Sequence, residues 1–271
     1  MMALGAISPT TGPAAVIVTP PTRGHEVYFQ YVNEVLGGVG QKLPKEERYK
    51  ITLHTHAAGA RREGGGAADH GIEGKVLWIG REPGKADTNA MRPQMNEDKS
   101  LTAAGSLSSD WPKEKYLVAT GAPYPAQFIN AAQYLKDKGV SPKVGIIYQD
   151  DDYGLDGVKG LEFAAKEFGF QILARATYKT TDTAYAAPVT AMRAAGVDHV
   201  FLASTPSATG PIIGTAATLQ YAPQWIRLSP AWVGALAGTA DKPSPILPYL
   251  QQRFWVVTDA QCARGLVQAR C

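Results

Sequence analysis

The chain contains 271 residues, of which 45% are hydrophobic and 19% charged, and it carries a formal net charge of +3 at pH 7. This length and apolar content are enough for one large domain or two ordinary domains with hydrophobic cores. The small and dispersed charge excludes a basic surface for nucleic acid and a polybasic tail for membranes.

The first half of the chain alternates between apolar runs and amphipathic runs. It predicts strands over residues 2–8, 49–56, 76–80 and 100–104, and helices over 22–40 and 88–99. Residues 57–75, "AAGARREGGGAADHGIEGK", interrupt this rhythm, because they contain almost no apolar side chain larger than alanine. We expect this segment to be irregular.

The second half repeats the rhythm without interruption. It predicts strands over 143–149, 170–178, 197–204, 223–229 and 253–259, and helices over 154–170, 182–196 and 208–220. Strands that alternate with helices of about 12 residues are typical of βαβ units and a parallel sheet. Near-continuous apolar strands indicate a sheet that is covered on both faces.

These patterns predict an α/β fold with two Rossmann-like lobes and parallel sheets. The Pro- and Gly-containing segment "TGAPYP", residues 120–125, is the natural boundary. We therefore expect an N-terminal lobe over 1–121, a second lobe over 122–260 and a disordered tail over 261–271.

Three consecutive carboxylates, Asp150, Asp151 and Asp152, follow the strand at 143–149. A calcium loop is excluded, since position twelve holds a hydrophobic residue in both registers tested instead of the required glutamate. A phospho-acceptor domain stays an alternative, although the strand "VDHVFLA" ends without the second acid that such a site needs. Helix capping explains most of the cluster, because acids at a helix start bond the free amides and complement the dipole.

The sequence contains few signs of catalytic chemistry or of a metal. It has neither a G-x-x-x-x-G-K-[ST] phosphate loop nor a G-x-S-x-G elbow. His54 and His56 share one face of a strand, but no further ligand stands at a supporting spacing. The two cysteines, Cys262 and Cys271, indicate neither a disulfide framework nor a thiolate metal site. We expect no enzyme activity, no metal and no cofactor.

Hydroxyl and aromatic side chains follow several of the predicted strands. In open α/β sheets ligands bind at the carboxyl ends of the strands, so side chains in these loops are the candidates for binding a small polar ligand. The candidate ligand-binding residues are Ser106, Ser108, Ser109, Tyr153, Ser204, Thr205, Ser229 and Trp232.

Several segments together resemble the extracytoplasmic solute-binding proteins of ABC transporters, in particular the branched-chain amino-acid-type family with the type I periplasmic-binding fold. The similarity covers most of residues 3–56 and 88–260. Its most specific part is "VGIIYQDDDYGLDGVKGLEFAAKEFG", and the other segments are "LGAISPTTGPAA", "TRGHEVYFQYVNE", "TYKTTDTAYAAPVTAMRAAGVDHVFLASTP", "QYAPQWIRLSPAW" and "FWVVTDA".

The resemblance implies a role for particular residues. Tyr153 matches the tyrosine that precedes a glycine in the family's second lobe, and Ser204–Pro206 and Ser229–Trp232 match two further ligand loops. The hydroxyl-bearing loop of the first lobe, which grips the carboxylate and amine of the ligand, looks like Gly105–Ser109. The other first-lobe loop should follow "VLWIG", where this chain departs from the pattern with Arg81 and Glu82.

The resemblance also implies function and partners. Two lobes joined by a hinge close on an amino acid or a related amide or acid and deliver it to an ABC permease in the membrane. Such proteins are periplasmic or tethered to the cell surface, whereas this chain has no signal peptide and, as given, is expected to be cytoplasmic. The alternative is a ligand-sensing receptor or regulator domain of the same fold. The sequence does not name the ligand.

Two segments depart from the family, namely residues 57–75 and the end "QCARGLVQARC", residues 261–271. We interpret both as out-of-frame translation in a truncated family member, with an ordinary divergent loop and short tail as the alternative. Loss of the family's returning segment would remove packing partners from the first lobe. We therefore expect ligand binding by this chain itself to be weak or absent.

Overall fold

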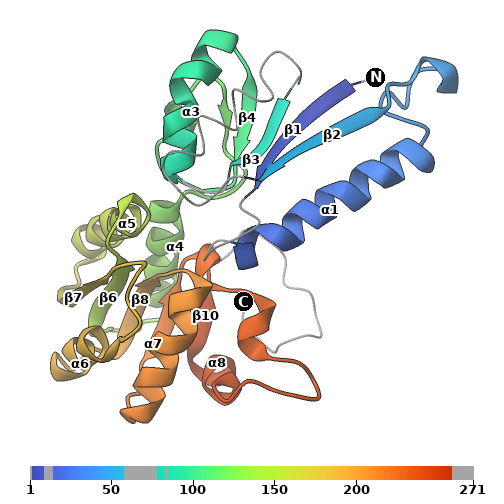
Figure 1. The fold of residues 1–271 in the computed structure, drawn as a ribbon. Helices are drawn as coiled ribbons and strands as arrows, with labels where there is room; N and C mark the ends of the chain where they lie inside the picture. Colours follow the sequence, from blue (N-terminus) through green and yellow to red (C-terminus); the bar gives the residue numbers. More distant parts are fainter. Residues whose placement is uncertain (1, 9–14, 58–77, 83–84, 258–271) are drawn as a thin grey trace. The chain divides into compact units, whose positions relative to one another are not determined.

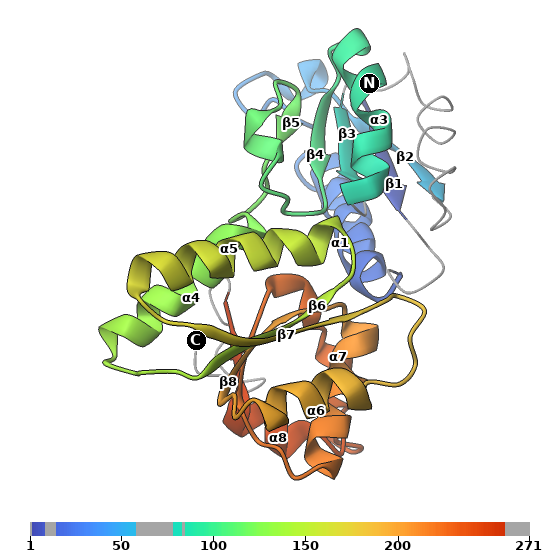
Figure 2. The same ribbon diagram turned by 90° about the vertical axis from the view of Figure 1, so that its left-hand side faces the viewer.

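The computed structural model describes residues 2–8, 15–57, 78–82 and 85–257. The chain divides into two compact units, Met1–Thr120 and Gly121–Cys271, within the Pro- and Gly-containing segment noted above. Each unit is built on its own parallel sheet (Figures 1 and 2). The fold class predicted from the sequence, α/β with parallel sheets, is confirmed.

Unit 1 has a five-stranded sheet in the order β2-β1-β3-β4-β5. Its strands are β1 (Met2–Ser8), β2 (Ile51–Ala57), β3 (Trp78–Glu82), β4 (Leu101–Ala104) and β5 (Leu117–Val118). Its helices are α1 (Ala15–Glu34) and α3 (Lys85–Asp98), with short 3-10 turns η1 (Lys45–Glu47) and η2 (Trp111–Lys113). All neighbouring strands of this sheet run parallel.

Helix α1 packs on β1 and β2 through apolar side chains, since Leu4, Val32 and Ile51 form a buried cluster. The amide of Asn33 ties the helix to the strand, because it accepts a hydrogen bond from the Ile51 N–H at 2.8 Å and donates one to the Ile51 carbonyl at 2.7 Å. The predicted start of this helix, at residue 22, was wrong. The helix begins at Ala15 and continues through Pro20 and Pro21.

One other first-half prediction differs from the structure, and two predicted segments fall almost wholly outside the described residues. Arg81 and Glu82, expected in a loop, belong to strand β3. The irregular segment 57–75 lies outside the described residues except for Ala57, which ends β2. The tail 261–271 also lies outside them.

Unit 2 has a five-stranded sheet in the order β10-β9-β8-β6-β7, again entirely parallel. Its strands are β6 (Val144–Gln149), β7 (Ile172–Tyr178), β8 (His199–Ala203), β9 (Gln224–Arg227) and β10 (Phe254–Val256). Its helices are α4 (Tyr124–Asp137), α5 (Asp152–Phe168), α6 (Ala186–Ala194), α7 (Pro206–Thr218) and α8 (Leu247–Arg253), with 3-10 turns η3 (Ser229–Ala231) and η4 (Gly234–Ala237).

The central strands of unit 2 are buried on both faces, as their sequences predicted. Ile146 and Ile147 on β6 and Phe201 and Leu202 on β8 are all fully buried. Figure 2 shows α4 and α5 over one face of this sheet and α6, α7 and α8 over the other. Strand β7 differs, because it lies at the sheet edge and its residues alternate between partly buried and exposed. Helix α8 and the 3-10 turns were not predicted.

Helices α4 and α5 approach closely because α5 carries glycines on the side that faces α4. A methyl group on Gly160 would lie 2.5 Å from the Cα of Pro125, and one on Gly157 would lie 3.1 Å from the Phe128 ring. Gly169, with φ +77°, ends α5 in the left-handed conformation. This helix pair fixes the position of the loop that precedes α5.

Candidate ligand-binding site

In unit 2 the loops after β6, β8 and β9 lie at one edge of the sheet, because the three strands are parallel neighbours. These loops carry the predicted Tyr153, the pair Ser204 and Thr205, and the pair Ser229 and Trp232. The hydrogen bonds of the loops decide which of these groups remain free for a ligand.

The loop after β6 is organised by Asp151, which is the N-cap of α5. One carboxylate oxygen accepts hydrogen bonds from the N–H groups of Tyr153 at 3.0 Å and Gly154 at 3.1 Å. The other accepts a hydrogen bond from the side-chain amide of Gln149. Helix capping, which was expected to explain most of the acidic cluster, is confirmed, since Asp151 is the N-cap and Asp152 the first residue of α5. Asp150, whose N–H donates to the Tyr178 carbonyl, belongs to the turn.

Gly154 permits a very tight turn at this point. A methyl group at this position would lie 1.9 Å from the Gln149 carbonyl oxygen and 2.9 Å from the Gln149 nitrogen. The first turn of α5 therefore folds directly back on the end of β6. This contact fixes the position of the neighbouring Tyr153.

Tyr153 is partly buried between two elements of unit 2. Its hydroxyl donates a hydrogen bond to the Ser204 carbonyl at 3.0 Å, and its ring packs edge-on against Tyr124 with ring centroids 4.8 Å apart. Burial, with smaller effects from Tyr124, Tyr178 and Asp151, raises the pKa of Tyr153 well above its ordinary value. Tyr153 is therefore a neutral hydrogen-bond donor that joins the loops after β6 and β8.

A second link between these loops was not predicted. The Tyr178 hydroxyl donates to the side-chain oxygen of Gln149 and accepts from the Thr205 N–H, both at 3.2 Å. Burial also raises the pKa of Tyr178, so its hydroxyl keeps its proton at neutral pH. Gln149 and Tyr178 are the last residues of two adjacent strands and are register partners, which is the signal that would have identified them.

The predicted hydroxyls of the loop after β8 differ in their surroundings. Ser204 is fully buried, and its hydroxyl lies 2.6 Å from that of Thr209, which in turn donates to the Thr205 carbonyl. The Thr205 hydroxyl is nearer the surface and lies 3.1 Å from that of Ser207. Ser204 thus contributes its backbone carbonyl to Tyr153 and its side chain to the interior.

The loop after β9 is held by Gln127 and Arg227. The Ser229 N–H donates to the side-chain oxygen of Gln127 at 2.9 Å, and the amide group of Gln127 donates to the Ala122 carbonyl at 2.9 Å. One terminal nitrogen of Arg227 donates to the Ser229 carbonyl, also at 2.9 Å. Trp232 follows with its ring beside the Arg227 guanidinium. Neither Gln127 nor Arg227 was identified from the sequence.

In unit 1 the predicted serines lie in the loop between β4 and η2. Ser106 and Ser108 are buried around Trp111, which is completely inaccessible to solvent. The indole N–H of Trp111 donates to the Ser106 carbonyl at 2.8 Å and to the Ser106 hydroxyl at 3.0 Å. The Ser108 hydroxyl accepts from the Asp110 N–H at 3.3 Å, and Ser109 is partly buried. Trp111 therefore stabilises this loop both by packing in its interior and by hydrogen bonding to Ser106.

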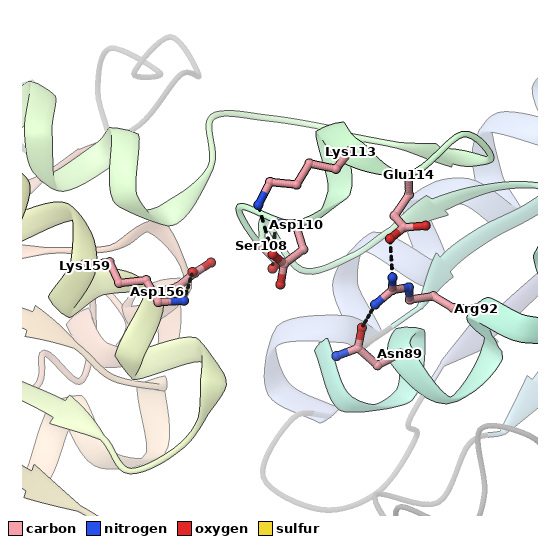
Figure 3. A network of polar contacts seen from close by, with 8 residues as sticks. All are labelled: Asn89, Arg92, Ser108, Asp110, Lys113, Glu114, Asp156 and Lys159. Carbon is pink, nitrogen blue, oxygen red and sulfur yellow. Dashed lines mark hydrogen bonds and ion pairs between the residues drawn. The ribbon is translucent and has the colours of Figure 1, made fainter.

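Polar contacts around this loop join it to the helix before it (Figure 3). Arg92 on α3 forms an ion pair with Glu114 and donates to Asn89 at 3.2 Å, while Lys113 lies 3.6 Å from Asp110. In unit 2, Figure 3 shows Lys159 beside the buried Asp156, at 3.5 Å. These pairs hold the scaffold together and bring no nucleophile and base into contact.

Residues 2–8, 15–57, 78–82 and 85–257 include no group of three or more acidic, histidine or cysteine side chains placed to hold a metal ion. His54 is exposed on β2. Within the same ranges no helix combines the length and apolar character required to cross a bilayer.

The capping role of Asp151 predicts a measurable effect on stability. Asp151→Ala is expected to lower the free energy of unfolding by about 1 kcal/mol, because two N–H groups of α5 lose their acceptor. Asp151→Asn should retain most of this stability, since asparagine caps helices equally well. The measurement is urea denaturation followed by circular dichroism, with the exposed Asp150→Ala as the control. Equal losses for Asp150→Ala and Asp151→Ala would contradict the role of Asp151.

Comparison with known proteins gives a family and a fold. The model of the family described as periplasmic binding protein matches residues 2–256. No curated protein sequence matches the chain. Among solved structures, the fatty acid ABC transporter substrate-binding protein from Thermomonospora curvata superposes with a TM-score of 0.83 at 24% identity, covering 94% of this chain and 63% of that one.

Two further solved structures share the fold. The leucine-binding protein from Thermotoga maritima has a TM-score of 0.73 at 17% identity and covers 87% of this chain and 65% of that one. An ABC transporter solute-binding protein from R. palustris, in complex with 4-hydroxybenzoate, has a TM-score of 0.72 at 18% identity, with coverages of 85% and 62%. The chain thus spans less than two thirds of the length of these proteins.

At these identities the structural matches establish the fold alone. The family match over residues 2–256 establishes the family membership that the sequence resemblance had predicted. The chain therefore belongs to the periplasmic binding protein family and has the type I fold of its leucine-binding members.

Proposed function

We propose that this protein is the solute-binding component of an ABC uptake system. It captures a small polar ligand, an amino acid or a related acid or amide, and presents it to a membrane permease from outside the cytoplasmic membrane. The two α/β units act as the lobes, and the segment that begins at Gly121 acts as a hinge. Family membership supports the general role, and the ligand class and the hinge closure are our proposal.

The observation that carries this proposal is the organisation of the loops in unit 2. Three loops that are far apart in the sequence are held at one sheet edge by Tyr153, Tyr178 and Gln127. In an open α/β sheet this edge is where ligands bind. These three side chains are bonded within the protein and hold the loops in place, whereas the Thr205 hydroxyl is nearer the surface and suits recognition of a polar ligand. No nucleophile–base pair accompanies them among the described residues.

Titration calorimetry with the purified chain tests the proposal. The probes are leucine, 4-hydroxybenzoate and octanoate, which represent the ligand types named for the three similar structures, together with their primary amides. Saturable 1:1 binding of at least one probe supports the proposal, and it would refute the expectation from the sequence that this chain binds weakly or not at all. If all six compounds fail to bind at millimolar concentration, the proposal is wrong for these ligand classes.

A further inference from the structure

Arg227 is a buried cation at the carboxyl edge of the unit 2 sheet. It is the last residue of β9, pairs in register with Leu202 on β8 and Val256 on β10, and is only 2% exposed. A side chain of this kind is rarely buried unless an anion accompanies it. Its partners are therefore informative about what the site is built to bind.

Among the described residues, two carbonyl groups bind one side of the guanidinium, while Nε on the other side has no partner. Nη1 donates hydrogen bonds to the carbonyls of Leu228 at 3.2 Å and Ser229 at 2.9 Å. Nε is buried and has no hydrogen-bond partner within the described part of the chain. Among the ion pairs of the described residues, none joins Arg227 to a carboxylate.

Aromatic rings complete the surroundings of this cation. The Arg227 guanidinium carbon lies 5.5 Å from the ring centre of Trp232 and 5.3 Å from that of Phe254. Contacts of this kind stabilise a cation but do not neutralise it. Burial lowers the pKa of Arg227 to about 9, so the group remains charged at neutral pH.

The geometry of the unpaired side fits a particular chemical group. In arginine, Nε and Nη2 form one edge of a planar fork, and two parallel hydrogen bonds from such an edge match the two oxygens of a carboxylate. The two carbonyl groups that hold Nη1 fix the direction in which this edge points. An uncharged ligand would leave the buried charge uncompensated.

We propose that Arg227 receives the carboxylate of the ligand through its Nε–Nη2 edge, so that the protein selects carboxylate-bearing solutes over their amides and esters. This inference rests on the solute-binding function proposed above. It assigns the carboxylate to unit 2, whereas the sequence resemblance assigned it to the loop Gly105–Ser109 of unit 1. Because Nε is buried in the structure, the proposal requires the side chains around the guanidinium, among them the half-buried Trp232, to shift as the carboxylate arrives. Arg227 is then the residue of unit 2 that binds the anionic group.

The competing explanation is that Arg227 only holds the loop after β9. The two explanations differ in what a neutral side chain of similar length does. If Arg227 waits for an anion, removal of the unpaired buried charge in Arg227→Met offsets the loss of the bonds to Leu228 and Ser229, and the melting temperature changes little. If Arg227 is a structural support, the same change lowers the melting temperature.

The decisive experiment compares acid and amide pairs by calorimetry on the full chain. The pairs are leucine with leucinamide, 4-hydroxybenzoate with 4-hydroxybenzamide, and octanoate with octanamide. We expect the wild-type protein to bind one acid about 100-fold more tightly than its amide, the effect of leaving a buried charge unpaired. Arg227→Met should abolish this preference, and Arg227→Lys should retain part of it.

Two controls separate this role from general effects. Arg193→Met removes an exposed arginine of the same unit that bonds a backbone carbonyl, and it should leave the acid preference unchanged. Binding should also change the tryptophan fluorescence, and Trp232→Phe should remove most of that change.

The outcomes distinguish this inference from the function on which it rests. Equal affinity for an acid and its amide, or unchanged preference in Arg227→Met, overturns the role of Arg227 and leaves the solute-binding function standing. Failure of all six compounds to bind overturns the proposed function for these ligand classes and the inference with it. The acid and amide comparison on the wild-type protein remains decisive even if Arg227→Met does not fold.

Discussion

Gly154→Ala is expected to destabilise unit 2 by at least about 3 kcal/mol, which is at the severe end for a single methyl group. The added carbon would lie 1.9 Å from the carbonyl oxygen of Gln149, well inside contact distance. A clash with backbone is not relieved by a rotamer change, so the start of α5 must move away from the end of β6. We expect loss of cooperative unfolding in urea, measured by circular dichroism, or failure to accumulate as soluble protein.

Gly214→Ala is the matched control. Gly214 also lies in a helix of unit 2, α7, and its added methyl group would meet only the Ile246 side chain, at 4.0 Å. Because alanine favours helices more than glycine by up to about 1 kcal/mol, this variant should be as stable as the wild type or slightly more stable. Similar stabilities for Gly154→Ala and Gly214→Ala would show that the tight turn at Gly154 is not required.

Trp111→Ala is expected to cost about 3–5 kcal/mol in unit 1, because it removes a completely buried indole and leaves a cavity. The same change removes the N–H group that bonds Ser106, so the loop between β4 and η2 loses both its core and its closing hydrogen bonds. Thermal unfolding measured by calorimetry should show the loss in the transition of unit 1.

Two further variants separate the contributions of Trp111. Trp111→Phe keeps much of the packing but not the donor, and should cost less than Trp111→Ala. Lys113→Ala breaks an exposed pair with Asp110 in the same loop and should change stability by no more than about 1 kcal/mol. If Trp111→Ala were as mild as Lys113→Ala, the loop would not depend on its tryptophan.

The fold was largely predictable because the buried strands carry their signal locally. The apolar run at 2–8 corresponds to β1, Met2–Ser8, and that at 143–149 to β6, Val144–Gln149. Predictions from the sequence failed where the position of an element depends on more than its own residues. Helix α1 was expected to begin at residue 22, although it begins at Ala15 and includes Pro20 and Pro21. The exposure of β7 depends on its place at the sheet edge, which a single segment does not reveal.

The candidate site was predictable only in outline. The end of a parallel strand identifies a loop at the binding edge, which is why Tyr153, Thr205 and Trp232 were chosen. The sequence does not show which side chains point into the interior. In the sequence, the buried Ser204 and Ser106 cannot be distinguished from exposed serines. Their bonds to Thr209 and Trp111 exist only after distant segments pack together.

The residues that sequence reasoning missed depend on strand register. Gln149 and Tyr178 meet because β6 and β7 pair in one particular alignment. Arg227 appears in "PQWIRLS" as an ordinary polar residue at the end of a strand, and its importance follows from burial without an acidic partner. Such three-dimensional relations leave no periodic pattern in the chain.

The bonds from Tyr153 to the Ser204 carbonyl and from the Thr205 N–H to Tyr178 have a thermodynamic consequence. They join the loops after β6 and β8 through groups of the protein itself. A ligand that arrives there spends little of its binding free energy on ordering them, and each side chain already held saves about 0.5–1.5 kcal/mol of lost rotational freedom. In Tyr153→Phe and Tyr178→Phe the loops would regain conformational freedom. A ligand would then have to order them, so the measured binding entropy would be less favourable.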